Sequence, residues 1–277
     1  MLDAFAAATR FVLYLGLLTC SGAVFASATS PRGGALGQYA IHVMRRGAMV
    51  TMAAALLSSV LLFFQLGGDP DQPTMLAVFG SSRGAALCLQ LAGALLLLAS
   101  PSDEPLSGGI RISNAALLTG SLAVSGHAIT EGLLNALVVL LHVSAAAWWI
   151  GSLLLMRYAW MHESTALFAK AVQQFSGWAL RFIVALVVAG AILVVTLVDF
   201  SADPLGTPYV RLLILKIALA LTVLAIAAGN RWRLTQPVLA GDEAAAAALC
   251  RRIDVELVVI TMLLAVTAVL VSYTSPT

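Results

Sequence analysis

The sequence predicts an all-α fold, a polytopic membrane bundle of about eight transmembrane helices. Hydrophobic residues make up 61% of the 277 residues and charged residues 10%, whereas a soluble domain has about 45–50% apolar and about 25% charged residues. The mean hydropathy is +0.98. Because so few charges cannot cover a surface that faces water, the lipid bilayer must be the solvent for much of the chain. We therefore expect residues 1–277 to form a single transmembrane domain.

The first half of the chain contains four apolar runs of about the length that a spanning helix needs, roughly 20 residues. They cover residues 10–28, 47–66, 84–100 and 112–129, and they are separated by breakers such as the Gly-Gly-Asp-Pro segment 67–70. The first run could also be a signal peptide, because Ala26-Ser27-Ala28 fits a small-x-small cleavage site. No basic cluster precedes this run, so we expect a retained helix.

Four further apolar runs cover residues 132–156, 178–200, 209–229 and 253–271, with breakers such as the Asp-Pro-Leu-Gly segment 203–206 between them. Most Lys and Arg residues fall in or beside the connections that follow the first, third, fifth and seventh runs. Cytoplasmic loops collect positive charge. We therefore expect both termini to lie outside the cytoplasm.

Several classes of function are disfavoured by the composition. The net charge is +2 without a basic cluster, so no nucleic-acid partner is expected. The three cysteines Cys20, Cys88 and Cys250 lie far apart, which favours neither a disulfide framework nor a thiolate metal site. The chain also lacks a P-loop and the short motifs of hydrolases and metalloproteases. We expect neither an ATP-driven pump nor an enzyme.

Polar residues recur along the fifth run and indicate a site within the membrane. Asn135, His142, Trp149 and Met156 follow one another every seven residues, and Glu131 precedes Asn135 by four, so they share one helix face. From the rise per residue, His142 lies roughly 15 Å from the external end, near mid-membrane. A tight helix interface that holds a hydrogen-bonded histidine is the alternative interpretation.

A second histidine, His127, lies near the external end of the fourth run in Ser125-Gly126-His127-Ala128. His127 and His142 should differ in depth by about 10 Å, which is too far for one compact metal site, because imidazole–metal bonds are about 2 Å long. Two sites in series, as in a conduction path, suit this spacing better. An interfacial, hydrated His127 is the alternative.

Two weaker candidates for metal binding lie on the cytoplasmic side of the second run. His42 and Met44 precede this run, and Met49 and Met52 follow. Histidine with a thioether suits Cu(I), although methionine is also a common filler in helices.

Charged and amide residues in the last two runs are expected to support the helices. Lys216 lies inside the seventh run and could pair with Asp199 or Asp203, because an ammonium group in lipid must snorkel or find a partner. Asn230 and Arg231 end the same run, and Glu256, in the eighth run, is expected to pair with a neighbouring arginine.

The segment LHVSAAAWWIGSLLLM (141–156) resembles the CopD family of bacterial copper-resistance membrane proteins, whose pattern is a histidine, a run of small residues and Trp-x-Gly-Gly-Leu. SGHA (125–128) is similar to the family's Gly-His-Ala segment, and QFSGWA (174–179) to its Arg-Phe-Ser segment. Residues 207–234 resemble its Lys…Asn-Arg region, and residues 251–276 its Glu-bearing last helix. The likeness covers most of residues 111–276, with a weaker echo at 10–22.

The resemblance implies an eight-helix bacterial inner-membrane protein with periplasmic termini that imports copper. It implies a separate periplasmic copper-binding protein of the CopC type as a partner, and it leaves a homo-oligomer open. His127 and His142 would contact copper, with His42, Met44 and Met156 as weaker candidates. Glu131, Asn135, Trp149, Lys216, Asn230 and Arg231 would support the site. Three residues depart from the family pattern, Ser152, Gln174 and Val210.

Two other functions are compatible with the same residues. The histidine-bearing helix also resembles, more faintly, membrane protoporphyrinogen oxidases, so His142 could be an axial ligand of haem b. The depth offset argues against His127 and His142 binding one iron. In the remaining alternative the polar residues only hold helices together in a structural subunit.

Overall fold

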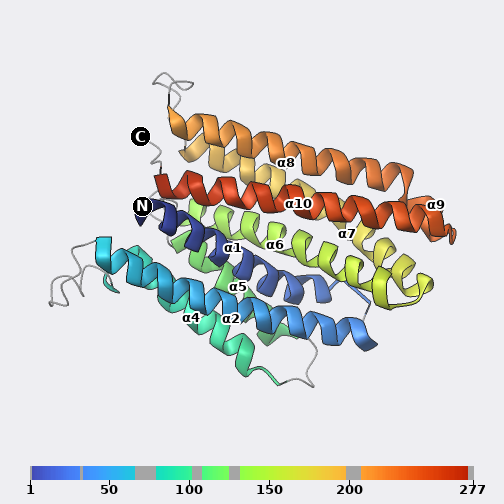
Figure 1. Cartoon of the computed structure of the whole chain (residues 1–277), viewed down its shortest axis with the longest axis horizontal. Helices are drawn as coiled ribbons and strands as arrows, with labels where there is room; N and C mark the ends of the chain where they lie inside the picture. The colour runs from blue at the N-terminus through green and yellow to red at the C-terminus, as the bar shows by residue number, and fades with distance from the viewer. Residues whose placement is uncertain are drawn as a thin grey trace.

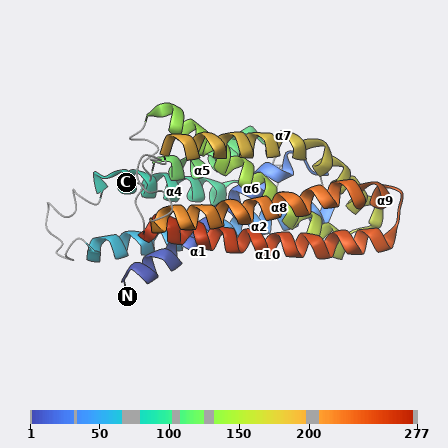
Figure 2. The same ribbon diagram turned by 90° about the horizontal axis from the view of Figure 1, so that it is seen from above.

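The computed structural model describes residues 2–31, 34–65, 79–101, 108–124, 132–197 and 207–273. In these segments the regular structure is entirely helical, which confirms the all-α fold. The helices are α1 (Leu2–Ser27), α2 (Gly34–Gln65), α4 (Ser82–Ala99), α5 (Gly109–Val124), α6 (Leu133–His162), α7 (Thr165–Leu197), α8 (Pro208–Arg233), α9 (Thr235–Leu239) and α10 (Glu243–Tyr273). All except the short α9 run along one direction and form an elongated bundle (Figures 1 and 2).

Seven of these helices are long and apolar enough to cross a membrane: α1, α2, α4, α6, α7, α8 and α10. The remaining predicted run, the fourth (112–129), overlaps α5, of which the structure describes 16 residues. The start of α1 and the end of α10 lie at the same end of the bundle (Figure 1). There, Arg10 Nη1 donates a hydrogen bond of 2.9 Å to Ser272 Oγ, so the first and last helices are in contact.

Several helices extend beyond the predicted apolar runs. Helix α2 begins at Gly34 and not near residue 47, α7 begins at Thr165 and not near residue 178, and α10 begins at Glu243 and not near residue 253. A span needs only about 20 residues to cross lipid, but a helix continues wherever backbone hydrogen bonds and packing support it. These three extensions lie at the end of the bundle where Lys and Arg gather, and their connections are short, with two residues between α6 and α7.

Helix α1 lies at the centre of the bundle and packs against α2, α5, α6 and α10. Its crossing with α6 depends on two glycines, because a Cβ atom on Gly151 would overlap the backbone of Gly22 and one on Gly22 would overlap the backbone of Ala147. Gly16 and Gly47 allow a similar approach of α1 to α2, where a Cβ on Gly47 would lie 2.8 Å from Cys20 N. Small residues at such crossings are typical of membrane bundles.

An aromatic stack fixes α6 against α7. Trp148 is fully buried, and its ring stacks on Phe182 with a centroid distance of 3.9 Å and on Phe175 at 5.4 Å. Its indole Nε1–H donates a hydrogen bond of 2.8 Å to Thr29 Oγ1 at the end of α1. The residue thereby satisfies its one polar group while its large apolar ring fills the core.

Helices α7 and α8 lie at the periphery of the bundle. Helix α7 packs mainly on α6, and α8 mainly on α10. Large apolar side chains on both remain exposed, including Leu180, Val195 and Leu221. In a bilayer such side chains face lipid tails, so their exposure costs nothing there.

Candidate functional site

His142 lies on α6 and points toward α7, where its Nδ1 is 3.0 Å from the carbonyl oxygen of Leu186. A carbonyl oxygen can only accept, so Nδ1 must carry the proton. The neutral imidazole then has an unprotonated Nε2 whose lone pair is free to bind a metal. Histidines that bind metals usually have their other ring N–H fixed in this way by a carbonyl or carboxylate.

Gly190 gives this imidazole its place against α7. A Cβ atom on Gly190 would lie 3.2 Å from His142 Cε1 and 3.5 Å from Nδ1. Gly190 lies one helical turn after Leu186, so the same stretch of α7 provides both the carbonyl acceptor and the space for the ring. His142 is half-buried.

Lys216, on α8, is the charged residue whose field acts on His142. The side chain is half-buried, and its ammonium forms no ion pair with any residue that the structure describes. The expected partners Asp199 and Asp203 lie outside the described residues, so that pairing stays a prediction. Lys216 therefore contributes a positive charge close to a neutral imidazole.

The other residues of the predicted stripe on α6 turn toward the interior. Asn135 is 7% exposed, Trp149 5% and Met156 4%, as expected for residues that share one inward face. His127 and Glu131, which we expect at the external entrance, lie outside the described residues. The structure thus places one of the two candidate histidines.

His42 and Met44 do not form a common site. His42 is exposed, and its Nδ1 is 2.8 Å from the Gln38 carbonyl on its own helix. Met44 is 1% exposed and packs in the core. No group of three or more His, Cys, Asp or Glu residues suited to a metal ion occurs among the described residues, so His142 is not part of a closed metal cage there.

A buried carboxyl group links α8 and α10. Glu256 is 1% exposed, and its Oε1 accepts a hydrogen bond of 2.7 Å from Asn230 Nδ2. The side chain of Trp149 also interacts with this carboxyl group, although its indole N–H makes no hydrogen bond of regular geometry. The expected arginine partner of Glu256 is therefore wrong, because Glu256 faces inward, and the neighbouring arginine–carboxylate pair is Arg157 with Asp254, at 2.6 Å.

One sequence signal could have revealed this partnership. Glu256 lies among Val255, Leu257 and Val258, and a carboxyl group within an apolar run requires an internal hydrogen-bond donor. Asn230, at the end of the preceding apolar run, is such a donor at a matching depth. No comparable signal pointed to Trp148, which anchors the aromatic stack. It is Trp149, and not Trp148, that has the seven-residue spacing from His142.

Arg231 joins α8 to α7 next to this network. Its Nη1 donates hydrogen bonds of 2.6 Å to the carbonyl oxygen of Ser176 and 2.7 Å to its hydroxyl. Asn230 and Arg231 thus hold α8 to two different helices, α10 and α7. These contacts are those of residues that support the bundle.

Two family models match the chain. Residues 1–136 match the model of the copper resistance protein D-like N-terminal domain, and residues 169–270 match that of copper resistance protein D. The chain belongs to the CopD family. It is therefore a multi-pass membrane protein related to copper resistance. No curated protein and no solved structure matches it.

The two matched ranges include some of the candidate residues and leave out others. Residues 1–136 include His127, and residues 169–270 include Lys216, Asn230, Arg231 and Glu256. His142 and Trp149 lie between these ranges, so their assignment depends on the motif in 141–156 and on the contacts described above.

Proposed function

We propose that this CopD-family protein carries copper from the periplasm to the cytoplasm across the bacterial inner membrane, past His142. The observation that carries the proposal is the hydrogen bond from His142 Nδ1–H to the Leu186 carbonyl. It fixes the tautomer that leaves Nε2 available to a soft or borderline metal ion. Copper is the substrate in this account and not a resident cofactor.

The path begins at the external end, where His127 is the proposed first contact. From there the ion moves inward to His142, about 10 Å deeper by helix rise. The membrane potential favours this direction by about 2.3 kcal/mol per elementary charge per 100 mV. Met156, four turns further along the same inward face, is a further thioether candidate, and His42 and Met44 are weaker ones.

The charge of Lys216 favours transport of copper past His142 over tight binding of the ion there. Its positive charge acts on His142 and opposes tight binding of a cation to the imidazole. Conduction requires binding sites that an ion can leave as well as enter. A single histidine ligand beside a positive charge meets that requirement, whereas a storage site would surround the ion with several ligands.

The same proposal fixes the setting of the protein. The chain forms a single transmembrane domain, and in support of this one buried cluster contains residues of both halves, from Leu17 to Leu264. Both termini face the periplasm, and a separate protein of the CopC type delivers copper there. Association of two copies is compatible with the exposed apolar faces of α7 and α8, and the proposed role is transport without an enzymatic step.

Copper uptake into cells tests the proposal. His142→Ala should abolish the accumulation of copper in cells, because His142 is the only described histidine between α6 and α7 that could bind the ion. His162→Ala is the matched control, since His162 is exposed at the end of the same helix and should leave uptake unchanged. Full uptake by His142→Ala, with the protein present at normal levels, would remove His142 from the path.

No observation in the described part of the chain favours the haem alternative. His162 ends α6, about 30 Å along the helix from His142 by helix rise, and His42 is exposed near the start of α2. The absorption spectrum of the purified protein tests this point, since a haem protein would show a Soret band.

A further inference from the structure

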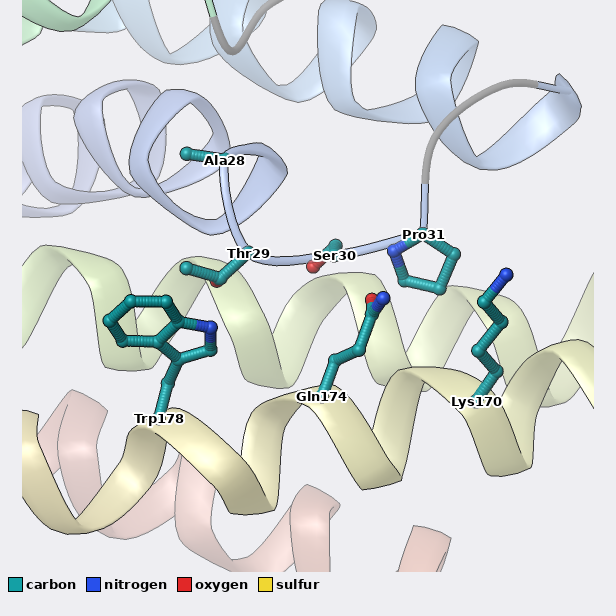
Figure 3. Close-up of a pocket in the computed structure, with 7 residues that line it drawn as sticks. All are labelled: Ala28, Thr29, Ser30, Pro31, Lys170, Gln174 and Trp178. Atoms are coloured by element: carbon teal, nitrogen blue, oxygen red, sulfur yellow. The ribbon is translucent and has the colours of Figure 1, made fainter.

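A cavity of about 450 Å³ lies between the segment that follows α1 and the first half of α7 (Figure 3). One wall is the connecting strap Ala28, Thr29, Ser30 and Pro31, which begins with a turn. The other consists of Lys170, Gln174 and Trp178, which follow one another every four residues and therefore share one face of α7. The copper path does not use any of these residues.

Two polar side chains of α7, Lys170 and Gln174, line this cavity. Lys170 is exposed and forms no ion pair with the described residues. The Gln174 amide points at the strap beside Ser30 (Figure 3), and its buried Oε1 has no hydrogen-bond partner. The amide oxygen and nitrogen exchange places by a half-turn, so either atom can meet a ligand. Thr29, by contrast, already accepts the hydrogen bond of the Trp148 indole.

The surroundings of the cavity are positively charged. The Arg181 guanidinium lies 4.6 Å from the centroid of the Trp178 ring. Arg231 of α8 donates a hydrogen bond to Ser176, which lies on α7 with Trp178. The Glu163 carboxylate, which accepts a hydrogen bond of 3.1 Å from Leu36 N, is not one of the residues that line the cavity. An anion in the cavity therefore meets the Lys170 ammonium group and polar side chains, and the lining contains no Asp or Glu.

The position of the cavity suggests where the anion comes from. It lies at the end of the bundle that collects Lys and Arg and is expected to face the cytoplasm. Trp178 is 40% exposed, and tryptophan is typical of the membrane–water interface. Beyond Arg181, toward the membrane centre, large apolar side chains of α7 are exposed, among them Val184, which is 53% exposed, and Val188, which is 52% exposed.

We propose that this cavity binds the phosphate group of an anionic phospholipid from the cytoplasmic leaflet. Lys170 supplies the opposite charge, and the Gln174 amide and the Ser30 hydroxyl supply further hydrogen bonds. The acyl chains lie along the apolar face of α7 below Trp178. Basic pockets at the cytoplasmic ends of membrane helices are known to hold anionic headgroups.

Lipid titration of the full-length protein in detergent tests this site independently of copper. The probes are phosphatidylglycerol, phosphatidylcholine and inorganic phosphate, with thermal unfolding and native mass spectrometry as readouts. Phosphatidylglycerol should raise the unfolding temperature and remain bound, and phosphatidylcholine should do neither. Lys170→Gln should weaken phosphatidylglycerol binding by about fivefold, the effect of one basic residue near an anionic surface.

Two variants make the test specific. Arg233→Gln removes the same charge from an exposed position outside the cavity and should leave lipid binding unchanged. Gln174→Arg adds a second cation to the cavity and should tighten binding. Equal binding of phosphatidylglycerol to the parent and to Lys170→Gln would overturn the proposal. Inorganic phosphate that matched the lipid in effect would assign the cavity to free phosphate and overturn the lipid source.

Discussion

His142 shows how a hydrogen bond decides what a buried histidine can do. A histidine in an apolar helix suits either a structural contact or a metal ligand, and the sequence offered both interpretations. The contact from Nδ1 to the Leu186 carbonyl serves the structure through one nitrogen and leaves the other available. The acceptor is a backbone group on another helix, so no residue pattern could have identified it.

Removal of the Lys216 charge should strengthen copper binding at His142. Lys216→Met keeps an unbranched side chain of similar length but removes the positive charge that acts on the imidazole. Because partly screened charges interact by an energy of order 1 kcal/mol, the dissociation constant for copper should fall severalfold. Competition titration with a copper chelator measures it, and unchanged or weaker affinity would contradict this role of Lys216.

Glu256 should matter more for stability than its neighbour Asp254. Glu256→Ala leaves Asn230 Nδ2 without its buried acceptor and should lower the free energy of unfolding by about 1–3 kcal/mol. Asp254→Ala breaks an ion pair whose carboxylate is 47% exposed, which typically contributes about 0–1 kcal/mol. Thermal unfolding in detergent compares the two, and an equal or reversed order would show that the Asn230–Glu256 contact does not stabilise the fold.

At the scale of the helices, the sequence predicted the number and order of the spans better than their ends. Seven predicted runs coincide with helices able to cross a membrane, because the apolar content of a run determines whether it inserts. The predicted starts of α2, α7 and α10 were wrong because these helices continue beyond the apolar runs, where their extensions pack on other helices. Tyr39 of α2, for example, stacks on Tyr158 of α6 with a centroid distance of 4.0 Å.

Helix crossings could not be derived from the sequence either. Gly151 belongs to the family-like motif, but the need for a glycine at this position comes from α1. There, the Gly22 backbone occupies the space that a side chain on residue 151 would need. The partner glycine is more than a hundred residues away in the sequence. Periodicity identifies the inward face of a helix, but not which helix it meets.

A methyl group at the α1–α6 crossing should therefore disrupt the bundle. Gly151→Ala places a Cβ against the Gly22 backbone and should cost about 1–3 kcal/mol through forced separation of the helices. Gly177→Ala is the matched control, because a Cβ there meets nothing within 4 Å. Unfolding temperature and yield of folded protein report the effect. A Gly151→Ala protein as stable as Gly177→Ala would show that the crossing tolerates the extra atom.

At the scale of the whole molecule, the start of α1 and the end of α10 lie together, and the charge distribution predicts the side of the membrane that they face. The Arg10–Ser272 hydrogen bond brings the two ends together. The opposite end carries the turn between α6 and α7 as well as α9 (Figure 1). The distribution of Lys and Arg predicts that this second end faces the cytoplasm.

Cysteine labelling in intact spheroplasts tests that orientation. In a background where Cys20, Cys88 and Cys250 are replaced by alanine, Ser164→Cys should be protected from a membrane-impermeant maleimide. Thr207→Cys, at the opposite end of the bundle, should react. Permeabilised cells, in which both positions should react, are the control. The reverse pattern in spheroplasts would invert the topology and the direction of the proposed copper path.

The central claim is that the imidazole of His142 binds copper, and copper analysis of the purified protein tests it most directly. The protein is loaded with copper, freed of excess metal, and measured for copper and iron per chain, together with His142→Ala and the control His162→Ala. The account predicts that His142→Ala retains less copper than the parent, that His162→Ala retains as much, and that neither contains stoichiometric iron. Equal copper in all three proteins, or iron lost with His142, would contradict it.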